Sequence, residues 1–229
     1  MLPLQLHAPV GEALSVLVIG AHPDDIEIGA GGLLLGLAAS RPRVRYMVLT
    51  GTAERHAEAQ AAASAFLPGA ELTVSLHDLP DGRLPAVWDR AKDILQGVAR
   101  SFAPDLVVAP SATDAHQDHR LIGEFVPTVF RDSLYLGYEI PKWDGDLGRP
   151  SMYFPLTAET ARRKVELLHK CYPSQRGHDW WDDEVFLGLA RLRGMECRAP
   201  YAEAFYCTKS LIIPAPVGQA RARRRGKEG

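Results

Sequence analysis

Short apolar runs alternate with longer segments of helical spacing along the first half of the chain. The runs cover residues 14–19, 44–50, 71–76 and 106–109, and the segments between them cover residues 31–40, 55–66 and 88–102. Apolar residues at helical spacing predict helices. The runs at 14–19, apart from Ser15, and at 106–109 are continuously apolar, which is typical of strands covered on both faces. This β-α-β-α order predicts a mainly parallel sheet with right-handed crossovers.

The pattern changes after residue 119. Residues 121–130, 157–169 and 183–193 are expected to be helices, with Thr157 capping the second and Gly194 ending the third. Residues 201–208 are expected to form a late strand. Residues 135–155 are aromatic, contain proline and are expected to be an irregular lip over a functional site. The fold class predicted is α/β, a Rossmann-like three-layer α/β/α arrangement with a mainly parallel sheet.

Composition sets limits on the domain organisation and the partners. The chain has 229 residues, 46% of them hydrophobic, and a net charge of −2, which does not indicate a nucleic-acid binder. Its three cysteines form no C-x-x-C pair, which fits a reducing compartment. No run approaches the ~18 apolar residues of a membrane span. We expect a cytoplasmic protein with no membrane partner, formed by one domain over residues 1–214 and a basic, disordered tail over residues 215–229.

The first polar cluster follows the first apolar run and is Ala21-His22-Pro23-Asp24-Asp25. The carboxyl end of a strand is where open α/β sheets bind ligands. Pro23 is expected at the first helical position, with both aspartates in the first turn, where the helix dipole stabilises negative charge. Capping alone requires one carboxylate. Because neighbouring residues point in different directions, one aspartate can face a metal and the other a substrate.

The second polar cluster, His116-Gln117-Asp118-His119, follows the fourth apolar run. Its histidines share a face if the segment is helical, although such a pair alone is more often a surface or core feature. A carboxylate such as Asp118 can hold the second nitrogen of a histidine. Imidazole and carboxylate together suit Zn²⁺, and Fe²⁺, Mn²⁺ or Co²⁺ can occupy the same set. The two clusters together predict a divalent metal site and hydrolytic chemistry.

These clusters resemble those of the LmbE/PIG-L family of N-acetylglucosaminyl deacetylases, which are metal-dependent enzymes that remove an acyl group from an N-acylated sugar. Three further segments support the resemblance, and it extends over residues 16–206. They are Arg55-His56-Ala57-Glu58, similar to the family's R-x-x-E; Leu79-Pro80-Asp81-Gly82, similar to a loop of the bacillithiol-biosynthesis branch; and Tyr201-Ala202-Glu203-Ala204-Phe205, similar to a late family motif.

The resemblance implies a role for each matching residue. His22, Asp25 and His119 match the metal ligands, with zinc the expected ion. Asp24 matches the general base. His116 matches the histidine that steadies the oxyanion and is expected to be protonated, with Asp118 as the carboxylate that orients it. Arg55 and Asp81 match positions that contact the sugar conjugate.

The substrate implied is a small-molecule N-acetyl sugar. GlcNAc-malate of bacillithiol biosynthesis is favoured by the resemblance of Pro80-Asp81-Gly82 to the loop of that branch, and the Arg55 guanidinium could pair with the malate carboxylate. A GlcNAc-inositol analogue, a nucleotide- or lipid-linked sugar, an antibiotic intermediate and a chitooligosaccharide stay open. The resemblance also implies a homo-oligomer, either a trimer or a hexamer. Aromatic residues such as Trp143 and Trp180 can stack on a sugar or serve only in packing.

Two other functions compete with this one. A dinucleotide-binding protein would need G-x-G-x-x-G after the first strand, and Gly20, Gly29, Gly31 and Gly32 do not have that spacing. A sugar-binding module without catalysis would be expected to lose at least one metal or acid–base position. The sequence retains all of them, which favours the enzyme.

Overall fold

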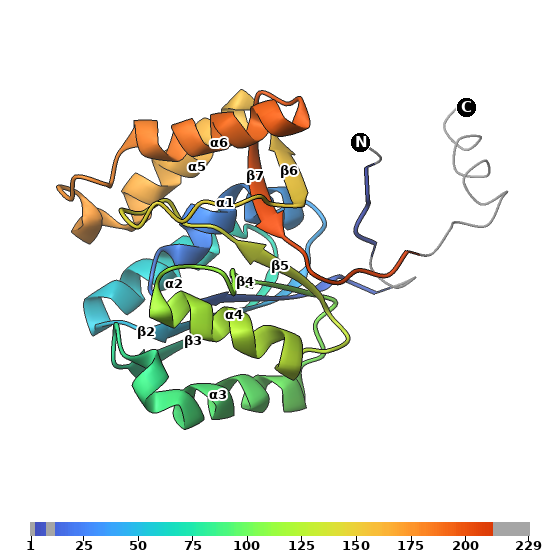
Figure 1. The fold of residues 1–229 in the computed structure, drawn as a ribbon, viewed down its shortest axis with the longest axis vertical. Helices are drawn as coiled ribbons and strands as arrows, with labels where there is room; N and C mark the ends of the chain where they lie inside the picture. Colours follow the sequence, from blue (N-terminus) through green and yellow to red (C-terminus); the bar gives the residue numbers. More distant parts are fainter. Residues whose placement is uncertain (1–2, 8–11, 213–229) are drawn as a thin grey trace, which may run out of the picture.

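A seven-stranded sheet organises the chain (Figure 1). The computed structural model describes residues 3–7 and 12–212, so the predicted tail at 215–229 lies outside the described residues. The strand order is β3-β2-β1-β4-β5-β7-β6, parallel from β3 to β5, with β7 antiparallel to both neighbours. The strands are β1 Ser15–Gly20, β2 Arg43–Thr50, β3 Glu71–Leu79, β4 Leu106–Pro110, β5 Leu134–Tyr138, β6 Met152–Leu156 and β7 Tyr201–Tyr206. The predicted α/β class with a mainly parallel sheet is confirmed.

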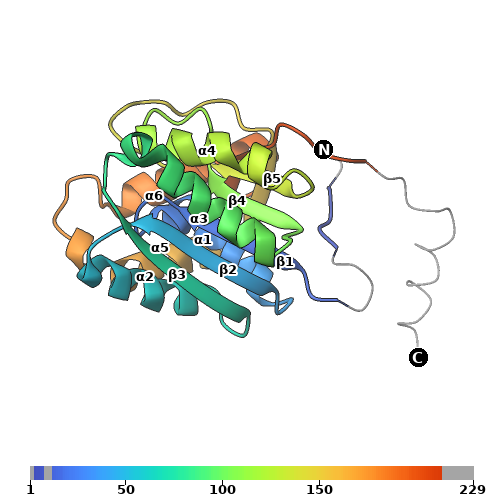
Figure 2. The same cartoon turned by 90° about the horizontal axis from the view of Figure 1, so that it is seen from below.

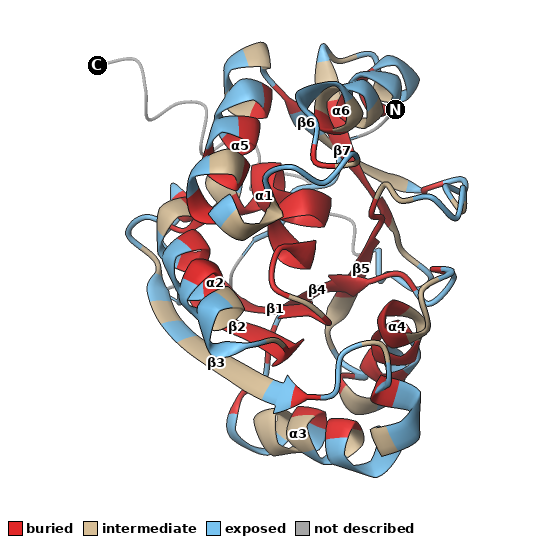
Figure 3. Ribbon diagram, turned by 90° about the vertical axis from the view of Figure 1, so that its left-hand side faces the viewer, coloured by how far each residue is buried: buried red, intermediate tan, exposed pale blue. Residues whose placement is uncertain are grey.

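Helices cover both faces of this sheet (Figure 2). They are α1 Asp25–Ala38, α2 Ala53–Phe66, α3 Trp88–Ser101, α4 Gln117–Val129, α5 Ala158–Cys171 and α6 Asp183–Cys197. Along β1, Val16 and Val18 belong to the core with α1, α2 and α5, whereas Leu17 and Ile19 belong to the core with α3 and α4. Because both faces of β1 are covered, its sequence is apolar from Val16 to Ile19. Helix α1 is itself largely buried (Figure 3).

The predicted irregular segment at 135–155 is wrong at both ends. Strand β5 extends to Tyr138 and strand β6 begins at Met152, so only residues 139–151 between them are irregular. Strand β6 lies at the edge of the sheet. Pro155 is compatible with a strand there, since an edge position can do without one backbone donor.

Two predicted helix boundaries also need correction. Helix α6 continues past Gly194 to Cys197, and Arg198 ends it at φ 63°. A Cβ at position 194 would lie 2.6 Å from the Cα of Tyr201, so the glycine allows close packing against β7 instead of ending the helix. Helix α1 begins at Asp25 and not at residue 31, and Pro23 precedes the cap residue Asp24. The glycines of α1 obscured this start.

The sheet brings the two polar clusters together. Strand β1 pairs with β2 on one side and with β4 on the other, so the order of connection reverses at β1. Ligands of open α/β sheets bind at such a reversal, outside the carboxyl ends of the strands. The first cluster follows β1 and the second follows β4, so both lie at this edge. No helix in the described part of the chain is both long and apolar enough to span a membrane.

Candidate active site

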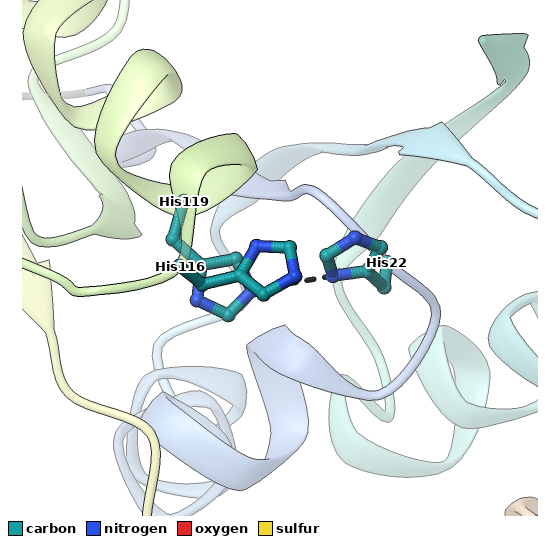
Figure 4. Close-up of side chains that lie close together, drawn as sticks. All are labelled: His22, His116 and His119. Atoms are coloured by element: carbon teal, nitrogen blue, oxygen red, sulfur yellow. Dashed lines mark hydrogen bonds between the residues drawn. The ribbon is translucent and has the colours of Figure 1, made fainter. Parts of the chain in front are cut away.

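A pocket of about 610 Å³ opens at the carboxyl ends of β1 and β4. The loop from β1 to α1 contributes His22, Asp24 and Asp25 to its lining, and the start of α4 contributes His116 and His119. The three imidazoles face one another across the floor (Figure 4). The structure therefore brings together the residues predicted as metal ligands and the two predicted as base and oxyanion donor.

The three predicted metal ligands converge. His22 Nδ1 lies 3.2 Å from His119 Nε2, Asp25 Oδ1 lies 3.2 Å from His119 Nε2, and Asp25 Oδ2 lies 3.4 Å from His22 Nδ1. Two donors bound at about 2.0–2.1 Å to a tetrahedral ion lie about 3.3 Å apart. These spacings fit one divalent ion bound by all three residues. One ring nitrogen of His116 lies within 4.8 Å of ring nitrogens of His22 and His119. His116 is therefore also next to the point on which the three predicted ligands converge.

A carboxylate holds the outer nitrogen of each ligand histidine. Asp118 Oδ2 lies 3.2 Å from His22 Nε2, and Asp114 Oδ2 lies 3.1 Å from His119 Nδ1. Such pairs fix the ring orientation and leave the other nitrogen free for a metal. Asp114 was not predicted as a functional residue. Its place five residues before His119 in a histidine-rich segment is the one sequence signal that could have indicated it.

The predicted partner of Asp118 is wrong. Its carboxylate does not orient His116: it faces His22 and accepts hydrogen bonds from the backbone N–H groups of Gly82, at 2.8 Å, and Leu84, at 2.9 Å. Asp118 is fully buried, and these hydrogen bonds connect the loop after β3 to the first polar cluster. These partners lie far away in the sequence, so local spacing could not identify them.

His116 forms the N-cap of α4. Its Nδ1 accepts a hydrogen bond from the backbone N–H of Asp118 at 3.3 Å, so a neutral ring carries its proton on Nε2. Burial and the neighbouring His119 and His22 lower the pKa of His116. This direction opposes the predicted protonated ring, whose charge stays a prediction, and a ring in either state offers its Nε2–H donor to the pocket.

Asp24 combines unusual backbone geometry with a tuned carboxyl group. It is buried and has φ 105°, a conformation that costs a non-glycine residue about 1–3 kcal/mol and is often retained at functional sites. Burial and the adjacent Asp25 raise the pKa of Asp24 to about 7, against the opposing effect of Arg55. A carboxylate with a pKa near the working pH suits a general base.

Arg55 lines the pocket, where its predicted contact with the sugar conjugate stays a prediction. Its Nη2 lies 2.6 Å from Asp24 Oδ2, and its Nη1 lies 2.7 Å from Glu58 Oε2 and 2.9 Å from Ser174 Oγ. The guanidinium is thus paired with two protein carboxylates and holds the carboxylate of Asp24 in place. Glu58 and Ser174 thus hold the side chain of Arg55, and contact between these three residues was not predicted.

Asp81, the second predicted substrate contact, lies at the rim. Its side chain is 76% exposed, and its Oδ1 lies 3.0 Å from His22 Nε2. The hydrogen bond from His22 lowers the pKa of Asp81. Its contact with a sugar stays a prediction.

Carboxylates dominate the electrostatics around the ligand histidines. Burial lowers the pKa of His22, but Asp25, Asp118 and Asp81 outweigh this effect and raise it to about 12. Burial likewise lowers the pKa of His119, and Asp25 and Asp114 raise it to about 9. A cluster that attracts protons this strongly also attracts a divalent cation, which binds the neutral rings in place of the protons.

Comparison with known proteins agrees with this geometry. Residues 17–130 match the family model described as PIG-L, GlcNAc-PI de-N-acetylase. An uncharacterized deacetylase of Escherichia coli (strain K12), YaiS, is 30% identical over 139 residues, which cover 55% of this chain and 74% of that protein. The chain belongs to the PIG-L deacetylase family. All eight predicted site residues lie within the matched region.

Solved structures share the fold of this PIG-L family member. The conserved protein TT1542 from Thermus thermophilus has a TM-score of 0.71 at 23% identity, covering 90% of this chain and 99% of that chain. The N,N'-diacetylchitobiose deacetylase from Pyrococcus horikoshii has a TM-score of 0.68 at 22% identity, covering 87% of this chain and 85% of that chain. These similarities establish the Rossmann-like layered fold.

Proposed function

We propose that this chain is a metal-dependent hydrolase that removes the acetyl group from an N-acetylglucosamine-type sugar conjugate. The observation that supports this best is the convergence of His22, Asp25 and His119 beside Asp24 and His116 in one pocket. Membership of the PIG-L family and the activity named for the Pyrococcus horikoshii protein agree with it.

The metal proposed is zinc, held by His22, Asp25 and His119, and the same donors accept Fe²⁺, Mn²⁺ or Co²⁺. A bound ion of this kind supplies Lewis acidity, which acidifies water and polarises an amide carbonyl. The carboxylates of Asp118 and Asp114 keep the two imidazoles aimed at the common point. The protein then has to supply a base, an oxyanion donor and a proton for the leaving group.

Asp24 provides the base. Its carboxylate accepts a proton from water as the water oxygen forms a bond to the amide carbon, while Arg55 holds Oδ2 in place. The Nε2–H of the neutral His116 donates a hydrogen bond to the oxyanion that develops on the carbonyl oxygen. The C–N bond then breaks, and the proton on Asp24 passes to the departing nitrogen. The products are acetate and a free amino sugar.

The competing function is a sugar-binding module without catalysis. It would bind the same N-acetyl sugars but would neither retain metal after purification nor release acetate. The carboxyl group of Asp24 in the same pocket as the three predicted metal ligands speaks against it, because a module that only binds sugar needs no general base.

The test is acetate release from a panel of N-acetyl sugars that includes N-acetylglucosamine, diacetylchitobiose and GlcNAc-malate. We expect release by the metal-loaded protein, loss of release after chelation, and recovery when zinc or another divalent ion is returned. Asp24→Asn should abolish release, whereas the exposed Asp132→Asn should not. A protein that holds no metal and releases no acetate from any member would favour the binding module.

Assembly is a separate part of the proposal. The family resemblance implies a homo-oligomer, a trimer or a hexamer. Sedimentation velocity at micromolar concentration distinguishes both from a monomer of 25.1 kDa.

A further inference from the structure

We infer that the pocket selects an N-acetyl sugar whose second group, the aglycone, is uncharged and apolar, and disfavours an anionic aglycone such as malate or phosphate. This rests on the proposed deacetylase function and specifies the substrate class for it. Two properties of the pocket lead to the inference: the pairing of its cations and the composition of its outer wall.

Both basic side chains of the described pocket lining are already paired. Besides Arg55, the lining contains Lys142, whose Nζ lies 2.9 Å from Asp114 Oδ2, 2.9 Å from Asp146 Oδ2 and 3.1 Å from the carbonyl oxygen of Ile140. An ammonium has three donors, and all three have partners here. The side chains of Arg55 and Lys142 are only 17% and 14% exposed. An anion entering the pocket would therefore have to displace a carboxylate to gain a cation.

The remaining charges of the lining are acidic. Asp81 and Asp144 are both exposed at the pocket, and neither has a lysine or arginine partner among the described residues. Deeper in the site, the carboxylates of Asp25 and Asp118 offset the two charges of a bound divalent ion. An anionic aglycone would thus lose water and meet like charges, which disfavours its binding.

Part of the pocket lining is apolar and aromatic, and we call this part the outer wall. It includes Ile28, Leu79, Ile140, Pro141, Trp143 and Trp180. Trp143 is 79% exposed, so a planar or aliphatic partner would cover ring surface that now faces water. Trp180 packs edge-to-face on the buried Trp181, with ring centroids 5.4 Å apart, which fixes its position.

The place of these residues in the chain supports a role in specificity. Trp143 lies between β5 and β6, and Trp180 lies just before α6, so both are outside the region that matches the family model. The catalytic floor comes from within that region. The catalytic residues and the two tryptophans proposed to contact the aglycone are thus encoded in separate parts of the chain.

The first experiment compares three substrates of the metal-loaded protein: an aryl β-N-acetylglucosaminide, GlcNAc-malate and free N-acetylglucosamine. We expect kcat/KM for the aryl glycoside to exceed the other two by about tenfold, a size that one or two aromatic contacts can supply. Equal or higher kcat/KM for GlcNAc-malate would overturn the inference while leaving the deacetylase function intact.

Calorimetric titration of the Asp24→Asn variant with the same three compounds measures binding without turnover. Tighter binding of the aryl glycoside supports the inference even if the wild-type protein releases no acetate, an outcome that would refute only the proposed function. Tighter binding of GlcNAc-malate, or binding of none of the three, would overturn the inference.

Matched tryptophan variants locate the effect. Trp143→Ala and Trp180→Ala should each lower kcat/KM for the aryl glycoside about threefold to tenfold and change that for free N-acetylglucosamine much less. Trp88→Ala is the control, because Trp88 is 47% exposed on α3 and packs on Phe125 away from the pocket. Asp144→Lys should raise kcat/KM for GlcNAc-malate. Absence of both effects would contradict the assigned wall.

Discussion

Two groups of buried charge lie along α1, one at its start and one in its middle. At the start, His22, Asp24 and Asp25 face the pocket. In the middle, Lys164 Nζ lies 2.7 Å from Glu203 Oε1 and 2.6 Å from the carbonyl oxygen of Ile28. Glu203 also accepts the backbone N–H groups of Gly32, at 2.6 Å, and Leu33, at 2.7 Å. Glu203 and Lys164 thus bond α1 directly to β7 and α5.

The two groups differ in how their atoms are satisfied. In the Lys164–Glu203 group, donors meet acceptors, and a buried pair of this kind belongs to the structure of the fold. At the start of α1, two imidazole nitrogens point at one another across 3.2 Å, an arrangement that needs a proton or an ion between them. A metal site therefore differs from a structural ion pair in that several metal-ligating atoms converge on one point. Burial of charge alone does not distinguish the two.

The largest effect is expected from removing one of the converging donors. His119→Ala should lose the bound metal and reduce acetate release to background, because the remaining ligands cannot complete the set. Metal content per chain, measured by mass spectrometry after purification, checks this. A variant that keeps one metal per chain would remove His119 from the ligands and weaken the distinction between the two groups.

Next in size is the loss of the base. Asp24→Asn should lower kcat by about 10²–10⁴ with metal content unchanged, because an amide cannot accept the proton of water. Asparagine tolerates positive φ better than most residues, so this variant keeps the backbone and isolates the chemistry. Rates near wild type, measured as acetate release at saturating substrate, would sink the assignment of Asp24.

Breaking the structural pair should affect stability instead of chemistry. Glu203→Ala should lower the free energy of unfolding by about 3–5 kcal/mol, since it leaves Lys164 buried without a counter-charge. Urea denaturation measures this. The matched control is Glu166→Ala. The side chain of Glu166 is 65% exposed and lies 3.2 Å from Arg163. Removal of this exposed ion pair should cost about 0–1 kcal/mol. Equal costs for the two variants would contradict the structural role.

The smallest effect concerns a bond just behind the site. Tyr172 donates a hydrogen bond of 2.6 Å to the fully buried Glu27, which also accepts one of 2.9 Å from Tyr46. Burial raises the pKa of Glu27 to about 7, so Tyr172→Phe should cost about 0.5–3 kcal/mol of unfolding free energy, the range that spans bonds to neutral and to charged groups. Tyr153→Phe, whose partner Glu196 is exposed, is the control and should cost less. Thermal and urea unfolding of both variants decide between these outcomes.

The sequence predicted well wherever the pattern is local. The spacing of apolar residues, and the polar residues that separate the apolar runs, predicted strands β1 to β4, helices α2 and α3 and the cap at Thr157. The start of α1 did not, because its glycines serve close packing: a Cβ on Gly29 would lie 2.3 Å from the ring of Tyr138. Strand β5 was missed because it is a run of only five residues, Leu134–Tyr138, whose last four fall in the aromatic segment at 135–155 that was expected to be irregular.

Sequence alone determined the chemistry of the site: which side chains follow β1 and β4, and that imidazoles and carboxylates gather where parallel strands end. Only the tertiary structure decided the partners. It placed Asp118 on His22, Asp114 on His119 and Arg55 on Asp24, and it paired the cations of the pocket. The reason is physical. Spacing along the chain sets directions within one element, whereas partners across elements depend on how a twisted sheet and its helices pack.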